Sequence, residues 1–123
     1  MIQPRSIVEI ADNSGAKIGR IFKVLGSSKK RVAKLGDIVV LSVQKAEPRK
    51  AVKKKDVLYA VVVRSRAPFR RADGSYIRFD ENAVVILDSA KKEPQAGRIF
   101  GPIPREIGER GFQTIISRAP EVV

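Results

Sequence analysis

The chain has 123 residues, 43% of them hydrophobic, and its 25 Lys and Arg outnumber 13 Asp and Glu to give a net charge of +12. That length and apolar content suit one folded domain and exclude a wholly disordered chain. The absence of Cys and His excludes disulfides and thiolate metal sites, and it removes the usual general base near neutral pH. No apolar run is long enough to span a membrane and no apolar signal core follows Met1, so the expected location is the cytoplasm.

The first part of the chain predicts two strands and a tight turn. Val and Ile number 28 against 5 Leu, which favours strands because β-branched side chains fit a pleated, half-buried surface. We predict strands over Ile7–Ala11 and Lys17–Leu25, joined by the turn-forming residues 12–15. Apolar residues fail to alternate within the second strand, which predicts a β-bulge near Gly19.

A basic loop and a third strand come next. The loop covers Gly26–Leu35 and leads into a strand over Ile38–Val43, with its end left open as far as Ala46. A polar, basic connection over Glu47–Lys55 then separates this strand from the following one.

The middle of the chain predicts two more strands and a projecting ribbon. The fourth strand covers Val57–Arg66, and its three consecutive valines at 61–63 indicate burial on both faces, as in a closed barrel. Residues Phe69–Phe79 predict a hairpin whose Asp73-Gly74 tip favours a type I′ turn. The fifth strand covers Ala83–Leu87.

The C-terminal part predicts little regular structure. Gly and Pro over Gly97–Pro104 predict an irregular segment, and Arg105–Gly108 suits at most one helical turn. Residues Phe112–Arg118 suit a short helix, with an apolar stripe that caps the barrel. We therefore predict a mainly β fold: a small five-stranded β-barrel with a projecting β-ribbon and a short C-terminal helical segment. It forms one domain over residues 1–123, with the barrel at about 1–90, the ribbon at 69–79 and the C-terminal loop and helices at about 97–120.

Basic residues are distributed unevenly along the chain. Residues 49–78 alone carry a net charge of +8, whereas residues 79–123 carry −1. Such an excess is best neutralised by a polyanion, and Arg offers a planar fork of donors to phosphate oxygens. Arg64 and Arg66 lie two apart on the predicted strand, so both are expected on one face. We predict RNA binding by the clustered basic residues Lys29, Lys30, Arg31, Arg49, Lys50, Lys53, Lys54, Arg64, Arg66, Arg70, Arg71 and Arg78.

The kind of nucleic acid follows from what the sequence lacks. No helix-turn-helix, basic zipper or Cys/His finger occurs, which disfavours these modes of DNA reading. The aromatic residues are scattered, and we expect most in the core, with Phe69 and Tyr76 on the ribbon as the exceptions. Without a stacking platform, recognition is expected to rely on phosphates and the shape of a large folded RNA.

Two other classes of function compete with a structural RNA-binding protein. One is a free-standing RNA-binding or chaperone module, such as a cold-shock-like barrel, which would stay in the soluble fraction rather than sediment with a particle. The other is a nucleic-acid-processing enzyme. The chain has no phosphate-cradling Gly loop, no nucleophile elbow and no paired-carboxylate motif, so we predict no enzyme activity, no catalytic residues, no cofactor and no metal.

One resemblance covers essentially the whole chain. The segment AVVVRSRAPFRRADGSYIRFDENAVVI, from Ala60 to Ile86, resembles the signature segment of the large ribosomal subunit protein fourteen family, bacterial type. Further matching pieces are Met1-Ile2-Gln3, ADNSGAK from Ala11 to Lys17, Val24-Leu25-Gly26, Gly36-Asp37-Ile38, Val52-Lys53-Lys54, RIFGP from Arg98 to Pro102, Arg105-Glu106 and APEV from Ala119 to Val122. At Lys55 the family usually has Gly, which leaves open whether this chain takes a positive φ there.

The resemblance implies a place and partners. It implies a structural constituent of the large ribosomal subunit that binds large-subunit rRNA and touches small-subunit rRNA in intersubunit bridges. It also implies contacts with ribosomal proteins three and nineteen, and with a ribosome silencing factor. The protein-facing residues carried over from the family pattern are Arg98, Ile99, Phe100 and Arg105.

Overall fold

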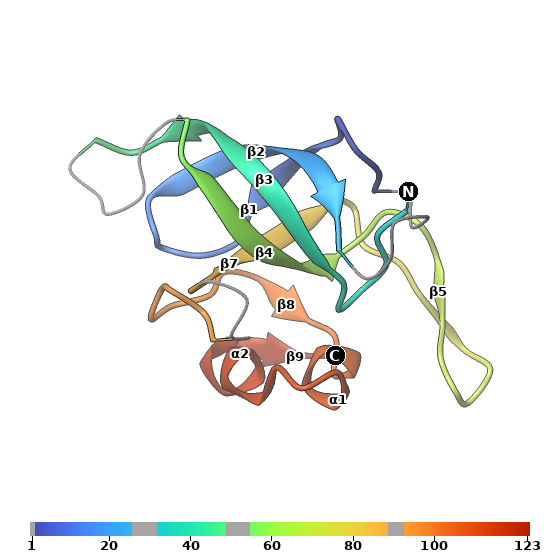
Figure 1. Ribbon diagram of the computed structural model, residues 1–123. Coiled ribbons are helices and arrows are strands. Elements are labelled where there is room, and N and C mark those ends of the chain that lie inside the picture. The colour runs from blue at the N-terminus through green and yellow to red at the C-terminus, as the bar shows by residue number, and fades with distance from the viewer. Residues whose placement is uncertain (1, 26–31, 49–54, 89–92) are drawn as a thin grey trace.

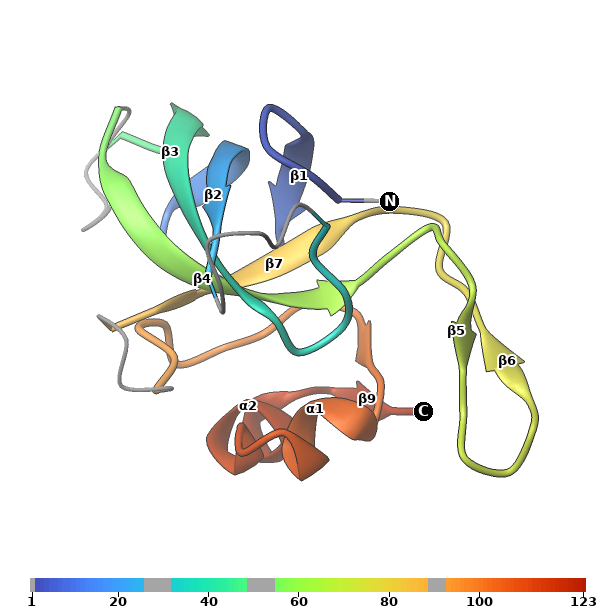
Figure 2. The same ribbon diagram turned by 45° about the vertical axis from the view of Figure 1, so that its right-hand side comes forward.

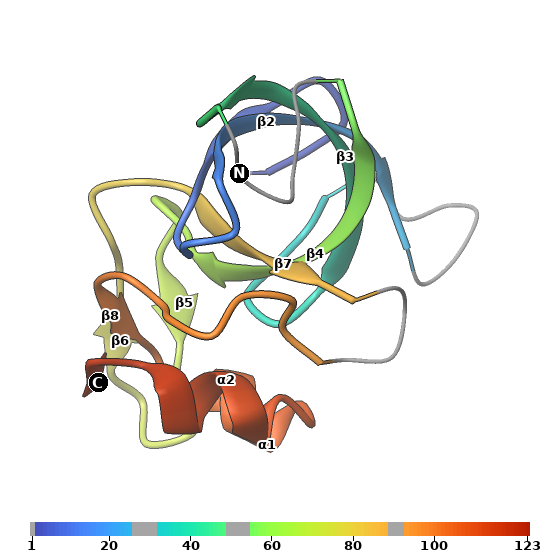
Figure 3. The same cartoon turned by 90° about the vertical axis from the view of Figure 1, so that its left-hand side faces the viewer.

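The computed structural model of the chain describes residues 2–25, 32–48, 55–88 and 93–123. Five strands close into a barrel, and Figure 3 looks into it. Each strand pairs antiparallel with its neighbour except at the parallel β1–β7 pair, which closes the barrel. The mainly β, five-stranded barrel predicted from the sequence is thereby confirmed. In barrel order the strands are β1 (Ile7–Ile10), β2 (Ala16–Val24), β3 (Ile38–Ala46), β4 (Val57–Arg64) and β7 (Ala83–Leu87).

The core follows from strand alternation. In β3 the inward residues Val39, Leu41 and Val43 are fully buried, whereas the residues between them are partly exposed. In contrast, all residues of β7 and residues 60–64 of β4 are buried on both faces. The outer face of these two strands is covered by the C-terminal part of the chain, which lies against β4 and β7 in Figure 1. The prediction from the three consecutive valines is confirmed.

Strand β2 carries the predicted bulge. Its register against β3 shifts between Ala16 and Ile18, between Ile18 and Gly19, and again between Ile21 and Lys23. A side chain at Gly19 would place its Cβ 2.9 Å from Leu41 Cδ1, so the strand approaches the core too closely there for any larger residue. The break in the alternation of apolar residues in the sequence therefore corresponds to the bulge in β2.

The ribbon projects from the barrel, and its tip differs from the prediction. Strands β5 (Phe69–Arg70) and β6 (Tyr76–Ile77) form it, and Figure 2 shows it standing away from the barrel. The Gly74 N–H donates to Arg71 O at 3.0 Å, the Arg71 N–H donates to Ser75 O at 2.8 Å, and Gly74 has φ 89°. These bonds define a type I turn followed by a left-handed Gly, a three-residue loop. The type I′ prediction was wrong because only Gly74 takes a positive φ.

The C-terminal part forms a small layer on the outside of the barrel. Helices α1 (Glu106–Glu109) and α2 (Gln113–Arg118) are connected to a two-stranded parallel sheet of β8 (Pro102–Ile103) and β9 (Glu121–Val122). The sequence analysis missed this sheet because two-residue strands leave no periodic pattern. The expected apolar stripe is confirmed, since Phe112 and Ile115 are buried and Ile116 and Ala119 pack against the same core.

The end of β4 differs from expectation, and its start settles a point that the sequence left open. Strand β4 stops at Arg64 rather than Arg66, because Ser65 and the following residues turn toward the ribbon. At the start of the same strand, Lys55 has φ 73° and its N–H donates to Val43 O at 2.8 Å. The chain therefore keeps a left-handed turn at Lys55 although it has a side chain there.

Candidate nucleic-acid interface

Five of the twelve basic residues predicted to bind RNA lie in the described part of the chain, all between β4 and the end of the ribbon: Arg64, Arg66, Arg70, Arg71 and Arg78. The other seven predictions concern residues outside the described ranges: Lys29, Lys30, Arg31, Arg49, Lys50, Lys53 and Lys54.

The ribbon presents cations to solvent. Arg70 and Arg78 are exposed, and Tyr76, which pairs with Arg70 across the ribbon, has 67% of its surface exposed. At the tip, Asp73 Oδ1 accepts hydrogen bonds from the Ser75 N–H (3.0 Å) and hydroxyl (2.6 Å), and these bonds lower the pKa of its carboxyl. The tip is thus held by its own hydrogen bonds, which leaves both arginines available to a polyanion.

Arg71 has another task, because it fastens the ribbon to the C-terminal layer. Its Nη2 donates to Val123 O at 2.7 Å and lies 3.1 Å from Glu106 Oε1. Only 13% of the Arg71 side chain is exposed. A ribbon braced in this way loses less conformational entropy when it binds than a free hairpin would.

Arg66 supports the root of the ribbon while remaining exposed. Its backbone N–H donates to Asn82 Oδ1 at 2.9 Å, and its Nε donates to Asp80 O at 2.8 Å. These bonds join the strand that enters the ribbon to the strand that leaves it. Arg66 therefore both positions the ribbon and remains within reach of an RNA phosphate.

Arg64 corrects the expectation that it shares an outer face with Arg66. It is 5% exposed, its Nη1 donates to Phe100 O (2.8 Å) and Pro102 O (3.2 Å), and its Nη2 lies 3.2 Å from Glu81 Oε1. Burial lowers the pKa of its guanidinium, and the carboxylates of Glu81 and Glu9 oppose that shift. With these contacts made inside the molecule, Arg64 joins the barrel to the C-terminal layer instead of facing RNA.

Of the four residues expected to face a protein partner, three are exposed and one is buried. Arg98 and Phe100 are exposed side by side, with the Arg98 guanidinium carbon 5.9 Å from the Phe100 ring centroid, and Arg105 is also exposed. Ile99 is only 2% exposed and belongs to the core, so its side chain cannot meet a partner. The expectation for Ile99 is corrected, because the alternation of an extended segment turns it inward between two outward neighbours.

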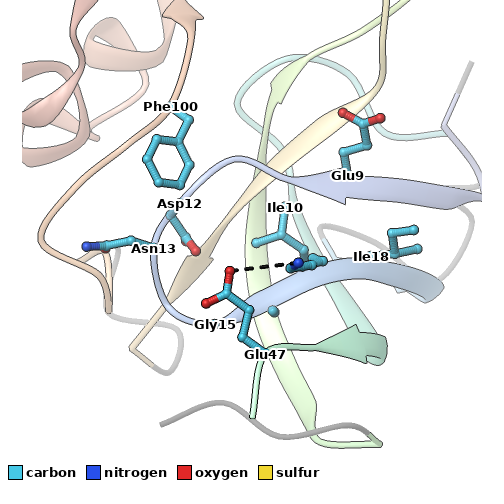
Figure 4. A pocket seen from close by; sticks show the side chains of 10 residues that line it. Glu9, Ile10, Asp12, Asn13, Gly15, Ile18, Glu47 and Phe100 are labelled. Atoms are coloured by element: carbon cyan, nitrogen blue, oxygen red, sulfur yellow. Dashed lines mark ion pairs between the residues drawn. The ribbon is translucent and has the colours of Figure 1, made fainter. Parts of the chain in front are cut away.

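A cleft beside this segment is shaped by the turn after β1, and Figure 4 shows Asp12 and Phe100 on the same side of it. Asp12 is buried and its carboxylate accepts from the Ser14 N–H and hydroxyl and from the Ile86 N–H, at 3.1, 2.6 and 2.9 Å. Burial raises the pKa of Asp12, and these hydrogen bonds partly oppose the shift. Glu9 and Glu47 also line the cleft with Lys17, whose Nζ lies 3.9 Å from Glu47 Oε1, so acidic side chains outnumber basic ones there and the cleft disfavours phosphate.

The sequence analysis missed a group of exposed residues on β2. Phe22 was expected in the core but is 50% exposed, and Arg20 and Lys23 beside it are exposed as well. Tyr59, at 36%, was likewise expected in the core, whereas Phe100, which was expected to face a protein, is 47% exposed. The slip in alternation around Gly19 was the available signal, because a bulge can turn an apolar residue outward.

The described residues contain no group of three or more His, Cys, Asp or Glu arranged to hold a metal ion. Nor does any helix within the described ranges have the length and apolar content needed to cross a membrane.

A closed β-barrel with exposed arginines on a braced ribbon defines a protein of the RNA-binding class, in which a rigid scaffold presents cations to a folded polyanion. Comparison with protein families narrows this class. The chain matches the family Ribosomal protein L14p/L23e over residues 1–123, its whole length, and it belongs to that family. It is accordingly a structural constituent of the ribosome that binds rRNA, and it resides in the ribosome in the cytoplasm. Proteins of this family are generally not enzymes.

Proposed function

We propose that this chain, of the bacterial type, is a constituent of the large ribosomal subunit that binds large-subunit rRNA and contributes to intersubunit bridges with small-subunit rRNA. One observation carries the proposal: the braced ribbon holds Arg70 and Arg78 exposed while Arg66 and Arg71 fix its root and side. Because the cations are preorganised, they can neutralise closely spaced phosphates at little entropic cost.

The proposed RNA-binding set keeps the residues that are free to reach a phosphate. Arg64 leaves the set, since its donors are used inside the molecule. Arg71 acts as a positioning residue for the ribbon. Besides Arg66, Arg70 and Arg78, the proposed set retains Lys29, Lys30, Arg31, Arg49, Lys50, Lys53 and Lys54.

A charge reversal on the ribbon tests this proposal. We expect Arg70→Glu combined with Arg78→Glu to lower incorporation into large subunits, measured by sedimentation and quantitation of the chain per particle. The loss of affinity relative to the unaltered chain is expected to be largest at low salt and to narrow as salt rises, since each lost phosphate contact removes about 0.7–0.9 from the slope of log affinity against log salt. Equal incorporation of the variant and the unaltered chain at all salt concentrations would refute the proposal.

A matched control is available at the other end of the barrel. The start of β2 and the end of β3 lie far from the ribbon in Figure 1. These strand ends carry the exposed Lys17 and Lys45, and Lys17 makes a 3.9 Å surface ion pair with Glu47. The pair Lys17→Glu and Lys45→Glu changes the net charge by the same amount, so it reports the effect of total charge alone. We expect it to reduce incorporation less than the ribbon pair does.

The contacts with proteins are part of the proposal too. We propose that the ribosome silencing factor contacts Arg98 and Phe100, which are exposed side by side, and the exposed Arg105. Phe100→Ala is expected to weaken capture of the purified silencing factor by large subunits. The matched control is Val122→Ala, an exposed apolar residue on β9.

Ribosomal proteins three and nineteen are proposed as neighbours within the subunit, and crosslinking of intact subunits tests them.

A further inference from the structure

The outer face of β2, β3 and the first half of β4 forms a continuous exposed surface. Strand register aligns Arg20 with Ser42 and Val57 in one row, and Lys23 with Val40 and Tyr59 in the next. Figure 1 shows these three strands side by side, with the C-terminal layer on another side of the barrel. Nothing in the described part of the chain covers the beginning of β4, where Val57 is 61% exposed and Tyr59 is 36% exposed.

The bulge in β2 adds an aromatic ring to this surface. Ile21 pairs with Leu41 and Lys23 with Val40, so Phe22 is the extra residue that has no partner on β3. An extra residue breaks the alternation, and Phe22 and Lys23 are both exposed between the buried Ile21 and Val24. The bulge therefore places Phe22 between the two rows, beside both Arg20 and Lys23.

The charge of this surface favours RNA over a protein partner. Arg20 and Lys23 have no ion pair with any described residue, and no acidic residue occupies the outer positions aligned in the two rows. An exposed apolar surface of this kind marks an interaction site, and interleaved cations on it would oppose docking by other parts of this basic protein. Aromatic rings flanked by cations are the combination that binds single-stranded nucleic acid.

We propose that this surface, the β2–β4 face, binds an unpaired stretch of rRNA, with bases stacked on Phe22 and Tyr59 and phosphates against Arg20 and Lys23. The inference rests on the proposed rRNA-binding function and adds a second mode of contact to it. Strand β3 separates β2 from β4, so the two rings lie about two strand spacings apart, roughly 10 Å. Two bases stacked on them cannot stack on each other, so a paired helix is excluded and an unpaired strand is selected.

The two tyrosines of the chain allow a direct measurement. The sequence contains no Trp and only Tyr59 and Tyr76, so the Tyr76→Phe variant has Tyr59 as its sole strong emitter. We expect a single-stranded RNA of about ten nucleotides to quench Tyr59 emission at low salt, because a stacked base contacts the ring. An RNA duplex of the same length is expected to bind through charge without this quenching.

Variants on the same background test each ring. Phe22→Ala is expected to weaken single-strand binding roughly five- to hundredfold, as loss of one base stack does elsewhere. Val122→Ala, which shortens an exposed apolar residue on β9, away from the β2–β4 face, is the matched control and should leave affinity nearly unchanged. Because Phe22 is half-exposed, its replacement should not unfold the barrel, and circular dichroism checks this.

The inference and the proposed function fail in different ways. If the ribbon reversals block incorporation but single-stranded RNA neither quenches Tyr59 nor depends on Phe22, the function stands and this inference is wrong. A benzophenone amino acid at position 22 extends the test to assembled large subunits. Crosslinks from that position to rRNA support the inference, and crosslinks only to a ribosomal protein overturn it.

Discussion

Replacing Arg64 with Met would remove the guanidinium that joins the barrel to the C-terminal layer while keeping most of its apolar volume. Two backbone carbonyls, Phe100 O and Pro102 O, would lose their donor in a partly buried place, and Glu81 would lose its ion pair. A buried polar group left unpaired costs about 1–3 kcal/mol. Because the Glu81 side chain is 38% exposed, its share is small, and we expect a total loss of about 3 kcal/mol.

Urea and thermal unfolding followed by circular dichroism would measure this loss. For a chain of this size, about 3 kcal/mol corresponds to a fall in Tm of roughly 10 °C. Hydrogen exchange should also locate it, because the amides of Phe100, Gly101 and Ile103 should exchange faster while those in the middle of β4 stay protected. Arg70→Met is the matched control, since Arg70 is exposed on the ribbon, and it should change stability by less than about 0.5 kcal/mol. A loss below about 1 kcal/mol for Arg64→Met would refute the role of Arg64 in joining the barrel to the C-terminal layer.

Three further predictions follow from single sites. Gly101 has φ 78°, and a Cβ there would collide with Arg64 Nη1, so Gly101→Ala should cost about 2–4 kcal/mol, and less when Arg64→Met is also present. Lys55→Gly should raise the free energy of unfolding by about 0.5–1 kcal/mol by relieving a positive φ, whereas Lys55→Ala should not. Burial raises the pKa of Asp12 above its ordinary 3.8, so between 3.8 and the folded value the unfolded chain loses this proton first and stability falls as pH rises. Urea titrations near pH 3.5 and pH 7 should therefore show the unaltered chain losing stability relative to Asp12→Asn as pH increases.

The barrel was predictable because its strands carry their own signals. β-Branched runs bounded by turn residues located all five barrel strands to within two or three residues, and three consecutive valines indicated a strand buried on both faces. The bulge near Gly19 was also visible, as a slip in alternation. Each of these features depends on local propensity and side-chain period, which a single sequence contains.

The ribbon tip and the C-terminal sheet show where local signals stop. Asp73-Gly74 suits a type I′ turn, yet the Asp73 side chain binds Ser75 and the loop takes three residues instead of two. The parallel β8–β9 pair joins residues 102–103 to residues 121–122, and neither dipeptide has a sequence pattern that predicts pairing with the other. Such pairings are decided by tertiary packing, because two hydrogen-bonded residues cannot offset their own loss of entropy.

The candidate RNA interface was the least predictable part, because composition counts cations without showing what they bind. Besides Arg66, four arginines in the described part of the chain bind its own groups: Arg64 and Arg118 donate to backbone carbonyls, Arg71 to Val123 O, and Arg110 to Asp37 Oδ1. Arg64 and Arg110 connect the C-terminal layer to the barrel, and Arg71 connects it to the ribbon. Arg118 connects it to Ala96, in the segment that precedes the layer in the chain. The guanidinium fork suits this task as well as it suits phosphate, because both need several donors in one plane. A basic cluster on a predicted strand is therefore compatible with either role, and only the contacts that each guanidinium makes in the structure distinguish them.

These two roles of arginine determine how much of the net charge of +12 is available to bind RNA. Arginines bonded to other groups of the chain fix the relative position of barrel, ribbon and C-terminal layer, so that the exposed cations are presented in one arrangement. A charge reversal at Arg64 and one at Arg70 should consequently both lower incorporation, but for different reasons. The first should also lower the free energy of unfolding and the second should not, so measuring stability and incorporation on the same two variants separates a structural cation from a binding one. Equal destabilisation by both reversals would show that this separation of roles is wrong.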